Sequence, residues 1–156
     1  MNQNLPFEVL RQLRAQGRTL ATAESCTGGL IGKLLTDIPG SSEVYMGGVI
    51  SYTNGVKHRL LGVSADTLRV YTAVSRQTAH EMAHGAREAV RADVGVSVTG
   101  LAGPDGDGTG RPIGLVYIGI DMEGFSFSQE LHLTGDREAI RGQAAEAALR
   151  MVLEYA

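Results

Sequence analysis

The sequence predicts an α/β protein: a three-layer α/β/α domain whose mixed, mostly parallel sheet includes one antiparallel hairpin. Strand-like and helical segments alternate along the chain, as expected for parallel strands connected by helices. Residues 113–122 and 125–133 are two strand-like segments joined at Glu123-Gly124, which favours a hairpin. With 156 residues, 43% of them hydrophobic, the chain suffices for one core but not for two. We therefore expect a single domain over residues 1–156.

The first elements follow from apolar spacing and from the residues that stop each run. A helix is predicted over 6–16, because apolar residues recur at helical spacing behind Pro6 and Gly17 ends the run. Residues 19–23 predict the first strand, and residues 30–35 predict a second helix with one apolar face. A polar corner therefore separates a strand from a helix.

A second strand and a second polar corner follow. Residues 44–52 are rich in β-formers, and Gly47 and Gly48 indicate a bulge or a close contact within this strand. Asn54 is placed to cap a short helix that ends at Leu61. The two corners should lie at the same end of the sheet, where loops at strand carboxyl ends form sites in α/β proteins.

The rest of the chain predicts one more helical turn over 64–68, a long helix over 76–91, and a strand over 94–98. Ser75 is the expected cap of the long helix, whose apolar stripe consists mainly of alanine and implies close packing. Beyond the hairpin, Asp136 or Thr134 is expected to cap a last helix over residues 137–155. These segments complete the layers on both sides of the sheet.

Composition and charge exclude several classes of protein. A net charge of −3 provides no basic field for nucleic acid. The single cysteine, Cys26, cannot form an internal disulfide, and residues 1–13 contain neither a basic head nor a long apolar run. The longest apolar run, 113–120, is much shorter than the roughly 20 residues of a membrane span. We expect a cytoplasmic protein that binds neither nucleic acid nor membrane.

The first corner, residues 23–29, combines hydroxyl side chains with glycines. Ser25 and Thr27 lie at the carboxyl end of a strand, and Gly28 and Gly29 let backbone N–H groups approach a ligand. Such groups suit a phosphate or a developing oxyanion. The alternative is that Ser25 or Thr27 only caps the following helix.

Lys57 projects from the first turn of the helix after the second corner. A serine hydroxyl is a poor nucleophile until a base takes its proton, and a lysine kept neutral by burial can be that base. Ser25 and Lys57 follow consecutive strands, so they can converge at one end of the sheet. The alternative is a solvated lysine on a helix surface.

Two further motifs are weaker indications of a functional site. The Gly-rich stretch 101–111 is interpreted as a ligand-facing loop, with a plain surface turn as the alternative. His80, Glu81 and His84 match the H-E-x-x-H pattern of zinc hydrolases on a predicted helix. A zinc site needs a third protein ligand, so two surface histidines beside an ordinary glutamate are the simpler interpretation.

Several motifs together resemble the CinA C-terminal domain family, over nearly the whole chain and in the family's order. They are Ala23 to Gly29, Tyr52-Thr53-Asn54 with Lys57, Ala73-Val74-Ser75, Thr99-Gly100 through Gly106, Pro112-Ile113-Gly114, and Gly135-Asp136-Arg137 with Arg141. The resemblance implies a nicotinamide mononucleotide amidohydrolase, which releases ammonia and nicotinic acid mononucleotide in pyridine nucleotide salvage. It implies neither a cofactor nor a metal.

The resemblance also implies roles for individual residues. Ser25 would attack the carboxamide carbon, Lys57 would act as general base, and Tyr52 would assist or orient proton transfer. The other implied residues bind substrate, stabilise the oxyanion or support the corner: Thr27, Gly28, Gly29, Asn54, Thr99 and Gly100. Arg137 and Arg141 are the two candidates for the cation that binds the substrate phosphate, and the sequence does not choose between them.

Two departures from the family pattern leave alternatives open. Thr72 stands where the family usually has glycine, which would favour a non-catalytic nucleotide-binding or regulatory module. His80 and His84 are not part of the pattern, and they keep the zinc hydrolase as the third hypothesis. The family commonly self-associates, and the small-residue stripe on helix 76–91 is compatible with a homodimer.

Overall fold

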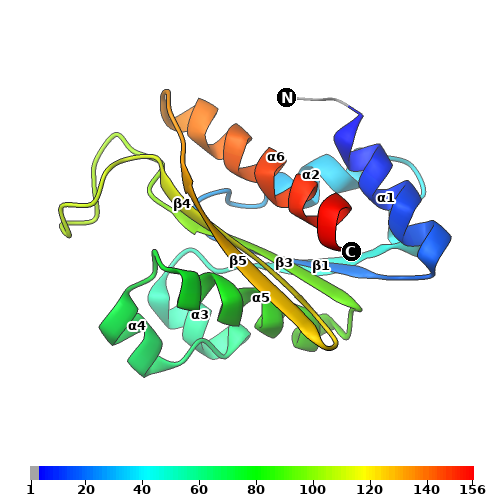
Figure 1. Ribbon diagram of the computed structural model, residues 1–156, viewed down its shortest axis with the longest axis horizontal. Helices are drawn as coiled ribbons and strands as arrows, with labels where there is room; N and C mark the ends of the chain where they lie inside the picture. Colours follow the sequence, from blue (N-terminus) through cyan, green and yellow to red (C-terminus); the bar gives the residue numbers. More distant parts are fainter. Residues whose placement is uncertain (1–3) are drawn as a thin grey trace.

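The computed structural model describes residues 4–156 and places a five-stranded sheet at the centre of this part of the chain (Figure 1). The strand order is β2-β1-β3-β4-β5. The strands are β1 (Leu20–Glu24), β2 (Tyr45–Ile50), β3 (Val94–Gly100), β4 (Leu115–Met122) and β5 (Phe125–His132). β1 pairs in parallel with both β2 and β3, whereas β4 is antiparallel to β3 and to β5. Only β4 therefore runs against the others, and the predicted mixed sheet with its hairpin is confirmed.

Helices cover both faces of this sheet. They are α1 (Leu5–Gln16), α2 (Leu30–Thr36), α3 (Asn54–Leu61), α4 (Ala65–Tyr71), α5 (Arg76–Val90) and α6 (Arg137–Tyr155), with a short 3-10 helix η1 (Ser41–Glu43) before β2. α1, α2 and α6 lie on one side, and α3, α4 and α5 lie on the other (Figure 1). The three-layer prediction is confirmed, although the first three residues of the predicted domain 1–156 lie outside the described range.

Two apolar clusters hold the layers together. The larger one joins β3 and β4 to α1, α2 and α6, and the smaller one joins β1 to α3 and α5. The alanine stripe of α5 belongs to this second interface, because Ala79, Ala83 and Ala86 are fully buried against the chain's own sheet. The stripe is therefore not available for self-association, which corrects the argument that linked it to a homodimer.

The helix caps mostly match the sequence, with one correction. Ser75 caps α5 by accepting from the N–H of Thr78, and Asp136 rather than Thr134 caps α6. Asn54, however, does not cap α3, because Thr53 occupies the cap position and its hydroxyl accepts from the N–H of Val56 at 3.4 Å. The Asn54 side chain is thus released from a capping role at the start of the helix.

The irregular pairing of β1 with β2 explains the two glycines in β2. The register slips after Leu20, which pairs with Tyr45 while Ala21 pairs with Gly47. A Cβ atom at Gly48 would lie 2.7 Å from the carbonyl oxygen of Thr22. The predicted bulge and close contact are both present, and they bring the ends of β1 and β2 level with each other.

Candidate active site

A pocket of about 390 Å³ opens where β1, β2 and β3 end. Five segments far apart in the sequence form its walls, so the sheet edge rather than any local motif creates it. The lining residues are Ser25, Cys26, Tyr52, Thr53, Asn54, Lys57, Ala73, Val74, Thr99, Gly100, Leu101, Ala102, Gly103, Asp105, Gly106, Asp107 and Arg137. Seven of the residues proposed from the sequence are among them, whereas Thr27, Gly28, Gly29 and Arg141 are not.

Ser25 and Lys57 meet at the floor of this pocket. The Nζ atom of Lys57 donates to Ser25 Oγ at 2.9 Å and to the carbonyl oxygen of Ser51 at 2.7 Å. Ser25 follows β1, whose last residue Glu24 lies beside Ile50 in β2, and the N–H of Ser51 donates to the carbonyl of Glu24. Adjacent strand ends thus place the first turn of α3 over the serine.

Burial controls the charge of Lys57. Its side chain is only 1% exposed, and no ion pair among the described residues involves it. An ammonium without a carboxylate partner is costly in such surroundings, and burial lowers the pKa of Lys57 to about 8 from its ordinary 10.5. A neutral amine is therefore accessible near physiological pH, and in that state the Ser25 hydroxyl can donate its proton to Nζ.

The corner after β1 is shaped by a buried carboxylate. Glu24 accepts from the backbone N–H groups of Gly29, Ile31 and Gly32 at 3.2, 2.9 and 3.1 Å, and so it satisfies the start of α2. Gly28 N–H donates to the carbonyl of Ser25 at 3.0 Å within the turn. The expectation that Gly28 and Gly29 offer N–H groups to a ligand is corrected, because both groups already have acceptors inside the protein.

The backbone N–H of Cys26 differs from those of Gly28 and Gly29. Within residues 4–156 it donates to no oxygen atom, and Cys26 lines the pocket directly after the serine. Burial raises the pKa of the Cys26 thiol to about 11, so the thiol stays protonated and is a weak nucleophile.

Thr27 is fully buried, and its Oγ1 has no hydrogen-bond partner among the described residues. Thr27 is not among the lining residues, so its contact with substrate stays a prediction.

Arg137 and Arg141 have different surroundings. Arg137 lines the pocket, and its guanidinium donates to the carbonyl of Gly103 at 2.5 Å and to the hydroxyl of Tyr52 at 2.9 Å. Arg141 instead donates to the carbonyl oxygens of Cys26 and Thr27 at 2.9 and 3.0 Å. Arg141 therefore supports the serine corner from behind, and only Arg137 of the two presents charge to the pocket.

The remaining predicted residues differ in what they offer a ligand. Tyr52 is 58% exposed, and its hydroxyl is hydrogen-bonded to Arg137 rather than to Ser25 or Lys57. Asn54 is exposed at the pocket mouth. Thr99 is buried, and its hydroxyl donates to the carbonyl of Ala73 at 2.7 Å. Gly100 is required by packing, because a Cβ atom there would lie 2.8 Å from the carbonyl oxygen of Leu115.

Two of the three H-E-x-x-H residues, Glu81 and His84, have partners away from the pocket. Glu81 accepts from the N–H of Ser64, and Nδ1 of His84 lies 3.0 Å from the carboxylate of Asp121. Asp121 pairs with Gly95 near the start of β3, at the opposite end of the sheet from Ser25. Within the described part of the chain, no three His, Cys, Asp or Glu side chains are arranged to hold a metal ion.

Sequence reasoning missed three groups at the site. Glu24 was not recognised as the carboxylate that fixes the corner, although an acidic residue beside Gly28-Gly29 and a helix start was the available signal. The Ser51 carbonyl that receives Lys57 Nζ has no sequence signal, because any residue carries one. Arg111 donates to the carbonyl of Val74 in the pocket wall, and its position in a Gly-rich loop did not reveal this partner.

The chain matches the family model described as the CinA C-terminal domain over residues 2–156. Solved structures with the same fold include the competence/damage inducible protein CihA from Agrobacterium tumefaciens, at 41% identity and a TM-score of 0.94, covering 97% of this chain and 93% of that chain. The competence damage-inducible protein A (ComA) from Klebsiella pneumoniae has 35% identity and a TM-score of 0.95, covering 98% and 95%.

Among curated relatives, the nicotinamide-nucleotide amidohydrolase PncC of Enterobacter agglomerans is 48% identical over 96% of this chain and 92% of its own length. A CinA-like protein from Kosmotoga olearia is 45% identical over 96% of this chain but only 36% of its own length. The chain likewise spans 36–37% of the length of other similar curated relatives. It is therefore comparable in extent to the PncC protein and to one part of the longer ones.

Proposed function

The chain belongs to the CinA C-terminal domain family, and from that premise we propose that it is a nicotinamide-nucleotide amidohydrolase. The substrate is nicotinamide mononucleotide, and the products are ammonia and nicotinic acid mononucleotide. The observation that carries the proposal is the buried pair in which Lys57 Nζ lies 2.9 Å from Ser25 Oγ on the pocket floor. The PncC relative, which this chain matches over 92% of that protein's length, supports the choice of substrate.

The pair performs the first half of the reaction as a nucleophile and its base. Neutral Lys57 takes the proton of the Ser25 hydroxyl while Oγ bonds to the carboxamide carbon, and the carbonyl oxygen becomes an oxyanion. The N–H of Cys26, which has no oxygen acceptor within residues 4–156, donates to that oxyanion. The Lys57 ammonium then gives its proton to the amide nitrogen, the C–N bond breaks, and ammonia leaves.

The second half repeats these steps with water. The nicotinoyl ester on Ser25 is attacked by a water molecule whose proton passes to Lys57, which has become neutral again. Collapse of the second tetrahedral intermediate breaks the bond to Oγ, and the proton returns to Ser25 from Lys57. The carbonyl of Ser51, held 2.7 Å from Nζ, keeps the amine aimed at the serine throughout.

Arg137 is the proposed partner of the substrate phosphate. Its contacts to Gly103 and Tyr52 fix the guanidinium at the pocket while leaving N–H groups free for phosphate oxygens. Tyr52 thereby positions Arg137, a role that differs from the expected assistance in proton transfer. Asn54 at the mouth is left to contact the polar part of the nucleotide.

The experiment is ammonia release from nicotinamide mononucleotide in the presence of a chelator. Wild-type protein should turn over, Ser25→Ala should be inactive while still folded, and Ser126→Ala on exposed β5 serves as the matched serine control. An acid quench during turnover followed by mass measurement should detect the nicotinoyl ester in wild type and not in Ser25→Ala. Turnover by Ser25→Ala would refute the serine mechanism.

Two other results of the ammonia-release experiment would favour a competing function. Nucleotide binding without any turnover by folded wild-type protein would favour a non-catalytic binding or regulatory module. Turnover that a chelator abolishes would point back to His80, Glu81 and His84.

We also propose that the protein is cytoplasmic. We propose further that it forms a homodimer, which sedimentation can test. No helix within residues 4–156 is long and apolar enough to cross a membrane.

A further inference from the structure

Thr72, which connects α4 to α5, has a backbone conformation that threonine rarely adopts. Its φ is +68°, a value that favours glycine, and the branched side chain makes it costly. Three hydrogen bonds hold it there: its carbonyl accepts from the hydroxyls of Ser75 and Thr78 at 3.1 and 2.7 Å, and its own hydroxyl accepts from the N–H of Val74 at 3.3 Å. Surrounding contacts therefore fix the direction of the Thr72 hydroxyl.

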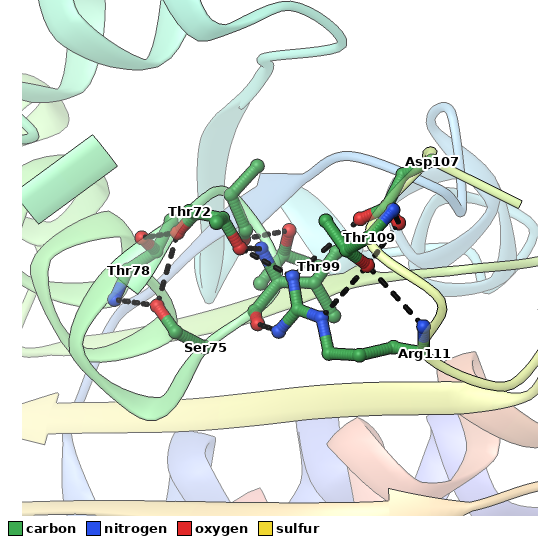
Figure 2. A network of polar contacts seen from close by, with 9 residues as sticks. Thr72, Ser75, Thr78, Thr99, Asp107, Thr109 and Arg111 are labelled. Atoms are coloured by element: carbon green, nitrogen blue, oxygen red, sulfur yellow. Dashed lines mark hydrogen bonds and ion pairs between the residues drawn. The ribbon is translucent and has the colours of Figure 1, made fainter. Parts of the chain in front are cut away.

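That hydroxyl faces Arg111 at the end of the Gly-rich loop (Figure 2). The Arg111 guanidinium donates to Thr72 Oγ1 and to the carbonyl of Val74, and its Nε donates to Thr109 Oγ1 at 3.2 Å. It also pairs with the Asp107 carboxylate at 3.5 Å. One side chain thus joins the loop to the segment that precedes α5.

Both of the joined segments line the active-site pocket. Asp105, Gly106 and Asp107 line it from the loop, and Ala73 and Val74 line it from the segment before α5. The second wall is anchored to the sheet, because the hydroxyl of Thr99 in β3 donates to the carbonyl of Ala73. The loop wall has no regular secondary structure; Arg137 holds it at Gly103, and Arg111 ties residues 107–109 to the segment before α5.

We propose that Thr72 and Arg111 form a latch that holds residues 105–110 against the pocket, and that both are positioning residues for substrate binding. The proposal rests on the proposed function, because the loop is inferred to contact the nucleotide. Neither residue is hydrogen-bonded to Ser25 or Lys57 in the described structure. The latch should therefore affect KM for nicotinamide mononucleotide and leave kcat nearly unchanged.

Three substitutions at Thr72 separate the effect of losing its hydroxyl from the effect of its unfavourable φ. Thr72→Val keeps the branched shape and loses the hydroxyl, Thr72→Gly loses both, and Thr72→Ser keeps the hydroxyl. KM should rise about five- to tenfold in the first two, as expected for losing one hydrogen bond that acts on the substrate only through the loop. It should stay near the wild-type value in Thr72→Ser, and kcat should stay within about twofold in all three. Thr72→Gly removes the unfavourable φ, so the test survives if Thr72→Val folds poorly.

Hydrogen exchange of residues 105–110 in the free protein provides a readout independent of turnover. Exchange should accelerate in Thr72→Val, Thr72→Gly and Arg111→Lys, and it should match wild type in Thr72→Ser. Unchanged exchange in the glycine variant, or an equal KM for the serine and valine variants, would overturn the latch. If wild type does not turn over, the proposed function fails while the exchange measurement still decides whether the latch exists.

Discussion

Ser25 Oγ and Lys57 Nζ are 2.9 Å apart although 32 positions separate the two residues in the chain. Parallel pairing of β1 with β2 produces this proximity, because Glu24 and Ile50 lie opposite each other at the two strand ends. Each reactive residue is then carried on the turn or helix that follows its strand. The distance between the Ser25 and Lys57 side chains is thus set by the spacing of neighbouring strands and by the bulge that levels their ends.

The rate should depend on pH through Lys57. Because the base must be neutral and its pKa is about 8, kcat/KM should rise toward a plateau above that pH. Below it, kcat/KM should fall about tenfold per pH unit. A profile recorded between about pH 5.5 and 9.5 on wild type checks this, with Lys57→Arg as an always-charged control that should be inactive throughout. A wild-type profile flat down to about pH 6 would exclude lysine as the base.

The lowered pKa of Lys57 should also make the free energy of unfolding depend on pH. Between about pH 8 and 10.5 the unfolded lysine holds a proton that the folded one has lost, so the free energy of unfolding increases with pH in this window. Relative to Lys57→Met, wild type should gain about 3 kcal/mol across it and change little below about pH 8. Urea unfolding of both proteins at about pH 7, 9 and 10.5 measures the difference, since the titrating groups that the two proteins share cancel. A constant difference would mean that the folded lysine is not perturbed.

Arg137 should lower KM only for substrates that carry a phosphate group. Arg137→Gln should raise KM for nicotinamide mononucleotide about ten- to a hundredfold, because a charge-assisted bidentate contact is lost. The weaker activity expected on nicotinamide riboside, which lacks the phosphate, should be unaffected by this substitution. Steady-state kinetics on the two substrates provides the comparison. Equal losses on both would assign Arg137 to the support of Tyr52 and the loop rather than to the phosphate.

Glu24 should matter for both stability and rate. Glu24→Gln replaces an oxygen that accepts from a backbone N–H with an NH₂ group, which leaves donors facing donors at the start of α2. We expect a loss of about 2–3 kcal/mol in unfolding free energy and a lower kcat, because the serine corner loosens. Glu43→Gln is the matched control, since its ion pair with Arg14 is exposed. A similar small effect for both substitutions would contradict the structural role of Glu24.

The sequence predicted those structural features that have a local cause or that result from the order of the strands. Apolar spacing and stop residues located the helices and strands, and the order of strands and corners indicated that Ser25 and Lys57 could converge. Gly47 and Gly48 were correctly interpreted because a glycine inside a strand usually marks a bulge or a close approach of another backbone.

The errors concern partners that spacing does not determine. The N–H groups of Gly28 and Gly29 were expected to face a ligand, but a carboxylate earlier in the same corner and a turn carbonyl already accept from them. The sequence left the choice between Arg137 and Arg141 open, and the structure distinguishes them because Arg141 donates to carbonyl oxygens 115 and 114 positions away. Thr53 rather than its neighbour Asn54 caps α3, a choice that depends on one pair of backbone dihedrals. Such contacts depend on tertiary placement, which composition and periodicity do not encode.

The pair proposed for the chemistry and several of the residues proposed for substrate recognition come from different parts of the chain. Ser25 and Lys57, the proposed nucleophile and base, lie within one continuous stretch built on β1 and β2, whereas the Gly-rich loop, Arg111 and Arg137 come after β3. Mutations in the Gly-rich loop or at Arg137 can thus alter which nucleotide is accepted without moving Ser25 or Lys57, whereas Arg141, in the same half, supports the serine corner. In evolutionary terms, this arrangement lets substrate preference drift among descendants while the chemistry is inherited intact.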